Sequence, residues 1–105
     1  QPGVVYHQLS MMPEADDEYA IEAFMLEISP GKEKGDSVYG HHGKELGIIQ
    51  EGRGELVYGT LRYILEKGDS ISFPSDIPHI LRNTGTGLLK AIWVISPPRK
   101  LFLKR

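Results

Sequence analysis

Two histidines and one glutamate stand out as side chains that could bind a metal ion or a polar ligand. His41 and Glu45 lie four residues apart with a glycine between them, and His79 opens a β-rich segment further along the chain. Successive side chains alternate between the two faces of a strand. A strand through the first segment would therefore put Tyr39 and His41 on one face and His42 on the other. We expect a cluster formed by Tyr39, His41, Glu45 and His79.

Such a cluster is compatible with three roles. Imidazole nitrogens and a carboxylate suit Zn, Fe, Mn, Ni or Cu, and two histidines with one carboxylate form an open metal site. The same groups without a metal would hydrogen-bond an organic ligand in a pocket. In the third case His41 and His79 simply complete a polar core whose hydrogen bonds are satisfied. The residues alone leave all three roles open.

The elements that must position these residues are predicted to be short strands. Glycine and proline recur at short intervals, and the segments between them are β-branched and aromatic, which predicts strands joined by turns. Residues 11–17 and the charged residues 31–35 are expected to be loops. The expected strands cover residues 4–9, 19–28, 37–42, 46–50, 55–58, 61–65, 70–73, 79–82 and 88–95. Eight or nine short strands without a convincing helix predict an all-β sandwich or barrel.

Composition narrows the function classes. The chain has 105 residues, of which 40% are hydrophobic and 25% charged, as expected for one globular domain. It has no cysteine, so it has no disulfide and no thiolate metal site. A net charge of −2 argues against nucleic-acid binding by this domain alone. No stretch approaches the roughly 18–20 apolar residues of a membrane span. We therefore expect a cytoplasmic location and no membrane partner.

The segment around His79 resembles the second motif of the cupin superfamily, G-x5-P-x-G-x2-H-x3-N. Gly68, Pro74, His79 and Asn83 match this motif at the family's spacing. Asp76 stands where the family usually has glycine. The resemblance implies a double-stranded β-helix, the cupin or jelly-roll barrel, formed by residues 1–105 as one domain with a core of about residues 18–98.

The end of the first cupin motif is matched by His41, Glu45 and Gly52, whereas Tyr39 replaces the leading histidine of that motif. The family's metal ligands are three histidines and a glutamate. The resemblance therefore implies His41, Glu45 and His79 as possible metal ligands for Zn, Fe, Mn or Ni, with Tyr39 in the fourth position.

A narrower resemblance, carried by residues 41–52, 68–73 and 92–98, is to the C-terminal cupin sensor domains of bacterial helix-turn-helix regulators of the XRE type. It implies a small-molecule effector in the barrel, a homodimer, and contact with DNA only through a separate N-terminal domain. The chain begins at Gln1, and we expect it to be excised from a longer protein. The ligand-binding residues would be Tyr39, His41, Glu45 and His79.

Two other functions stay open at this point. A small metal-dependent cupin enzyme, of the dioxygenase, isomerase or decarboxylase type, would hold its metal with His41, Glu45 and His79, and Tyr39 could act as a general acid. A purely structural dimerisation module would have a barrel packed shut by side chains. Trp93 is expected to pack in the core.

Overall fold

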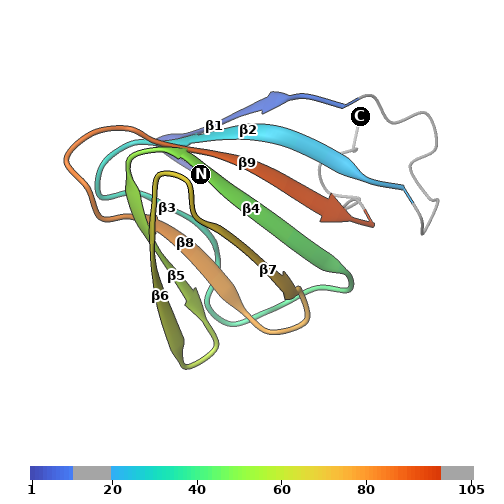
Figure 1. Ribbon diagram of the computed structural model, residues 1–105. Coiled ribbons are helices and arrows are strands. Elements are labelled where there is room, and N and C mark those ends of the chain that lie inside the picture. The colour runs from blue at the N-terminus through green and yellow to red at the C-terminus, as the bar shows by residue number, and fades with distance from the viewer. Residues whose placement is uncertain (11–19, 98–105) are drawn as a thin grey trace.

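The computed structural model describes residues 1–10 and 20–97, which form two antiparallel β-sheets (Figure 1). The strands are β1 (Val4–Gln8), β2 (Glu22–Ile28), β3 (Glu33–Asp36), β4 (Lys44–Glu51), β5 (Arg53–Tyr58), β6 (Leu61–Glu66), β7 (Ser70–Pro74), β8 (His79–Asn83) and β9 (Leu89–Ser96). One sheet has the order β1-β2-β9-β4-β7 and the other β3-β8-β5-β6. The predicted all-β architecture is confirmed. The predicted loop over residues 11–17 lies outside the described residues.

The core lies between the two sheets. Side chains along β2 and β9 alternate between buried and half-buried, which is the pattern of strands with one face on a core. The buried apolar residues come from both sheets: Phe24, Leu26, Ile28, Ile49, Leu56, Leu65, Phe73, Leu81, Leu89, Ala91, Trp93 and Ile95. In β4 the buried positions alternate in the same way, and one of them is Glu45. The fold therefore places a carboxylate on the inner face of a sheet.

The predicted strand over residues 37–42 is wrong, because the chain turns there. Asp36 ends β3, and its Oδ1 accepts hydrogen bonds from the backbone N–H groups of Val38 (2.7 Å) and Tyr39 (3.0 Å). Aspartate commonly stabilises a turn in this way, by bonding the backbone two or three residues on. The next strand, β4, begins only at Lys44.

The predicted loop over residues 31–35 is also partly wrong, because it contains most of β3. This strand pairs with β8, and Asp36 lies opposite His79 in the register. Two of the charged side chains that suggested a loop have a partner or are buried: Glu33 accepts a hydrogen bond from Arg82 at 2.9 Å, and Lys34 is buried. The other predicted strands are present, including the β5–β6 hairpin. Across the described ranges, no helix has the length and apolar character that a membrane crossing requires.

Candidate functional site

The structure brings together three of the four predicted site residues. Oε2 of Glu45 lies 2.7 Å from Nε2 of His41 and 2.9 Å from Nε2 of His79. The three donor atoms all lie within 4.8 Å of one another. Glu45 is 2% exposed and His79 8% exposed, and His41 is half-buried. Two imidazoles thus converge on a single carboxylate oxygen inside the protein.

Glu45 and His79 are positioned by strands of opposite sheets. Glu45 lies on the inner face of β4, paired with Phe73 of β7 and Ile95 of β9. His79 is the first residue of β8, and its Nδ1 lies 2.7 Å from the carbonyl oxygen of Ile77. The Phe73 ring packs edge-on against the imidazole of His79, with 4.9 Å between ring centres. Both side chains are therefore held by backbone pairing and by packing.

His41 precedes β4 and is held by its backbone. Its N–H donates to the carbonyl of Ser75 (2.8 Å), and the N–H of Ser75 donates to the carbonyl of Gly43 (2.7 Å). Gly43 has φ +125°, and a Cβ at this position would lie 2.6 Å from the carbonyl oxygen of Ser96. Only glycine accommodates both the conformation and the close contact. The glycine between His41 and Glu45 thus lets His41 turn towards the carboxylate.

The outer nitrogens of both imidazoles face backbone carbonyls. Nδ1 of His79 lies 2.7 Å from the oxygen of Ile77, and Nδ1 of His41 lies 3.3 Å from the oxygen of His42. Where Nδ1–H donates to such a carbonyl, the Nε2 of a neutral ring carries a lone pair. Two lone pairs would then point at a carboxylate oxygen, so the cluster needs a cation, either a proton or a metal ion. Metal-binding histidines are commonly oriented by this same outer hydrogen bond.

Glu45 stays ionised in this environment. Burial would raise its pKa, but the adjoining imidazoles of His41 and His79 and the positive charge of Lys34 together outweigh burial. The pKa of Glu45 is therefore held well below its ordinary value. A carboxylate whose charged form is favoured and that lies between two imidazoles is suited to binding a cation.

Trp93 fixes the second oxygen of Glu45, a role that the sequence did not indicate. The indole Nε1–H donates to Oε1 of Glu45 at 2.6 Å. Trp93 is 1% exposed, so the predicted core packing is confirmed as well. Gly47 pairs with Trp93 across β4 and β9, and a Cβ at position 47 would overlap the indole ring. The signal for this contact was the glycine two residues after Glu45, on the same face of the strand.

Lys34 is a second site residue that the sequence interpretation missed. It is 9% exposed, and its Nζ lies 5.9 Å from the centre of the Trp93 ring. A cation over an indole ring at this distance is attracted by the negative ring face. The same indole is hydrogen-bonded to Glu45. The barrel interior therefore holds a connected series of an ammonium group, an aromatic ring and a carboxylate.

Tyr39 does not join the cluster. Its side chain is 74% exposed, because the turn stabilised by Asp36 replaces the strand that would have put it beside His41. The predicted placement of Tyr39 is therefore wrong. The residue does line a cavity of about 340 Å³ together with Tyr6 and Lys34. Its predicted contact with a ligand stays a prediction.

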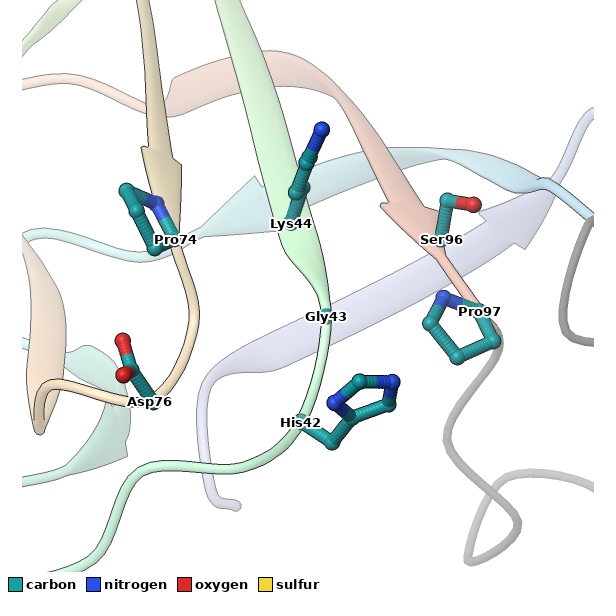
Figure 2. A pocket seen from close by; sticks show the side chains of 7 residues that line it. All are labelled: His42, Gly43, Lys44, Pro74, Asp76, Ser96 and Pro97. Atoms are coloured by element: carbon teal, nitrogen blue, oxygen red, sulfur yellow. The ribbon is translucent and has the colours of Figure 1, made fainter.

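His42 faces away from the cluster, as strand alternation suggested. It lines an outer cavity of about 430 Å³ with Asp76 and Pro97 (Figure 2). Figure 2 shows Pro74 and Asp76 on one side of residues 43–44, and Ser96 and Pro97 on the other. His41, Glu45 and His79 do not line this cavity, so it is separate from the candidate site.

Asn83, which matches the last position of the second motif, has a structural role. Its side chain is 1% exposed, and Nδ2 donates to the carbonyls of Ile28 and Gly87, both at 2.8 Å. Its Oδ1 accepts a hydrogen bond from the N–H of Gly85 at 2.9 Å. Asn83 thus ties β8 to the end of β2 and to the turn that leads into β9.

Two antiparallel sheets enclose an inward-facing cluster of two histidines and a glutamate, an arrangement that defines a β-barrel with a polar interior. The sequence profile of the cupin domain matches residues 24–95. The chain belongs to the cupin family, and the predicted cupin barrel is confirmed. A search of curated proteins finds no match.

Solved structures with the same fold include domains of transcriptional regulators and a putative isomerase. The Cupin_2 domain of an XRE family transcriptional regulator from Enterobacter cloacae is 21% identical, with a TM-score of 0.76, over 92% of this chain and 99% of that one. An HTH_3 family transcriptional regulator from Vibrio cholerae is 22% identical, with a TM-score of 0.75, over 92% of this chain and 52% of that one. A putative sugar phosphate isomerase from Acidithiobacillus ferrooxidans is 26% identical, with a TM-score of 0.64, over 72% of this chain and 49% of that one.

Proposed function

We propose that this cupin domain is the small-molecule sensor domain of a bacterial transcriptional regulator. We further propose that a divalent metal ion bound by His41, Glu45 and His79 helps to hold the effector in the barrel. The observation that carries the metal site is the convergence of two imidazole nitrogens on one carboxylate oxygen, at 2.7 and 2.9 Å. The regulator assignment is supported by the similar cupin domain of the XRE regulator, which this chain matches over nearly its whole length.

The donor set fits Zn, Fe, Mn or Ni. Nitrogen and oxygen ligands bind such ions at about 2.0–2.2 Å, so neighbouring donors around one ion lie about 3 Å apart. The separations between Glu45 and the two histidines are close to this value. Three protein ligands leave coordination positions where a bound metal would accept an oxygen or nitrogen atom of the effector. Trp93 donates a hydrogen bond to Oε1 of Glu45, so Oε2 stays directed at the two histidines.

A sensor must convert binding into a change elsewhere. The effector can shift the protein between two arrangements only if it binds them with different affinity. We propose that these arrangements are two geometries of a cytoplasmic homodimer that positions separate N-terminal DNA-binding domains. An edge strand of the four-stranded sheet supports the dimer proposal, because β6 exposes the large apolar side chains of Leu61, Tyr63 and Ile64.

A metal-dependent enzyme is the second candidate. The same two histidines and one glutamate resemble the facial triad of non-haem iron sites, which also leaves positions open for substrate. The likeness to the putative sugar phosphate isomerase supports this candidate at the level of the fold. Under this proposal turnover, rather than binding alone, would depend on the metal.

Native mass spectrometry tests the proposal. The chain is purified without chelator or histidine tag, and its native mass is compared with its denatured mass. We expect one metal ion per subunit of a dimer, lost in His79→Ala and retained in His42→Ala, which removes the exposed neighbouring histidine. An organic adduct, or a small molecule that raises the melting temperature, supports a sensor, since saturation at 100 times Kd stabilises a fold by about 2.7 kcal/mol. A monomer with neither metal nor adduct contradicts the proposal.

A further inference from the structure

A second buried carboxyl group lies on the inner face of the five-stranded sheet. Glu22 is the first residue of β2 and is 5% exposed. Its Oε1 is buried, and no group within residues 1–10 and 20–97 forms a hydrogen bond with it. Burial also raises the pKa of Glu22, because the charged form loses its hydration. A buried carboxyl oxygen without a partner costs free energy, and such a group calls for a structural or functional explanation.

Glu22 borders a small cavity with aromatic walls. The cavity has a volume of about 250 Å³ and is lined by Tyr6, Gln8, Glu22 and Phe24. In the register of β1 and β2, Gln8 lies opposite Phe24, so these side chains project from the same face of the sheet. The rings of Tyr6 and Phe24 lie 5.1 Å apart at an interplanar angle of 60°. The space is large enough for a short alkyl chain with a polar head group.

A carboxylate beside aromatic rings is suited to one class of head group. An ammonium ion is attracted by the negative faces of aromatic rings and forms a charge-assisted hydrogen bond with a carboxylate. A carboxylate or phosphate head group would instead be repelled by Glu22. An uncharged hydroxyl group could donate a hydrogen bond to Glu22 but would leave its negative charge without a counter-charge. The chemistry of the cavity therefore selects a cation.

The Glu22 cavity lies two strands away from the cluster of His41, Glu45 and His79 in the same sheet. Glu22 of β2 and Glu45 of β4 both pair with Ile95 of β9, on opposite sides of it. The two glutamates thus lie on the same cross-strand row of the inner face, with their backbones about 10 Å apart, which is two strand spacings. Tyr6 also borders the neighbouring cavity that Lys34 lines.

We propose that the Glu22 cavity, formed by the four lining residues named above, is a subsite for an aliphatic ammonium group. Glu22 provides the counter-charge, and the rings of Tyr6 and Phe24 contact the alkyl chain. The ammonium group supplies the missing partner of the buried carboxyl oxygen. Assigning this group to the effector rests on the proposed sensor function, whereas the subsite itself does not require a metal ion.

The test uses n-butylammonium as the probe, with n-butanol and butyrate as neutral and anionic counterparts of similar size. Binding is followed by NMR through the aromatic resonances of Tyr6 and Phe24, in the presence of EDTA. We expect n-butylammonium to shift these resonances saturably, with an affinity at least tenfold higher than that of n-butanol or butyrate. Glu22→Gln should lower the affinity for n-butylammonium at least tenfold. Glu27→Gln, on the other face of the same strand, should change it less than twofold.

Three results would overturn the proposal: no saturable binding of n-butylammonium, equal binding of n-butanol or butyrate, or unchanged affinity in Glu22→Gln. If Glu22→Gln loses the native spectrum, Tyr6→Leu replaces it, and an affinity equal to that of the unmodified protein overturns the proposal in the same way. His79→Ala separates this proposal from the metal site. We expect it to lose the metal and to bind n-butylammonium with unchanged affinity, and loss of both would contradict an independent subsite.

Discussion

Replacing Trp93 by phenylalanine tests whether the indole holds Glu45 in position. The substitution removes the Nε1–H donor that lies 2.6 Å from Oε1 of Glu45. A hydrogen bond to a charged group contributes about 1.5–3 kcal/mol to stability. Because Glu45 is 2% exposed, water is a poor substitute for the lost donor. The smaller ring also leaves a cavity, which adds about 1–2 kcal/mol. We expect a total loss of about 2.5–5 kcal/mol, so the melting temperature should fall by at least about 10 °C.

A double-mutant cycle separates the hydrogen bond from the cavity. Trp93→Phe, Glu45→Leu and the double variant are unfolded with urea in the presence of EDTA. In the Glu45→Leu background the indole has no carboxylate to bind, so Trp93→Phe should cost only the cavity contribution. We expect a coupling free energy of about 2 kcal/mol. A coupling below about 0.5 kcal/mol would show that Trp93 only fills space and would refute the positioning role.

Three further predictions concern other positions in the barrel. Gly47→Ala places a methyl group against the Trp93 ring, so thermal unfolding should show a loss of stability of about 1–3 kcal/mol. The control Gly87→Ala, where no atom lies within 4 Å of the added Cβ, should leave the stability nearly unchanged. Asn83→Ala removes three hydrogen bonds, of which one is buried and two are partly buried, and urea unfolding should show a loss of about 3 kcal/mol; a loss below about 1 kcal/mol would contradict the structural role of Asn83. Because burial raises the pKa of Glu22, the folded protein binds a proton at Glu22 more tightly than the unfolded chain does. The stability gained from this protonation is fully present below the ordinary pKa of glutamate and is lost as the pH rises through the pKa of the folded state. Glu22→Gln should therefore melt close to the unmodified protein at pH 4 and at a higher temperature than the unmodified protein at pH 7; an equal difference at both pH values would argue against an ionised, buried Glu22.

The sequence predicted the cluster because His41, Glu45 and His79 match the two cupin motifs at the family's spacing. Glu45 is on a strand with clear alternation, and His79 opens a strand after a proline-containing loop. His41 joins them although its segment is not a strand, because backbone hydrogen bonds to Ser75 hold it there. Tyr39 was misplaced because the aspartate that starts a turn after β3 leaves no hydrophobic pattern to reveal it.

The site residues that the sequence did not reveal are placed by pairing between strands that lie far apart in the sequence. Lys34 lies on a strand whose charged composition resembles a loop, and only its pairing with β8 reveals its buried face. The bond from Trp93 to Glu45 requires the register of β4 against β9, which places Gly47 under the indole. Glu22 likewise looks like a polar residue at a strand end, and the buried row that it shares with Ile95 follows only from the sheet order. Such contacts join residues more than 40 positions apart, so local sequence patterns do not reveal them.

X-ray anomalous diffraction from crystals grown with Mn²⁺ or Zn²⁺ tests the metal site most directly. We expect one strong peak per chain, within about 2.0–2.3 Å of Nε2 of His41, Oε2 of Glu45 and Nε2 of His79. The peak should disappear in His79→Ala. A peak only at the outer cavity of His42 and Asp76, or no ordered metal at stoichiometric concentration, would contradict the proposed metal-binding role of the cluster.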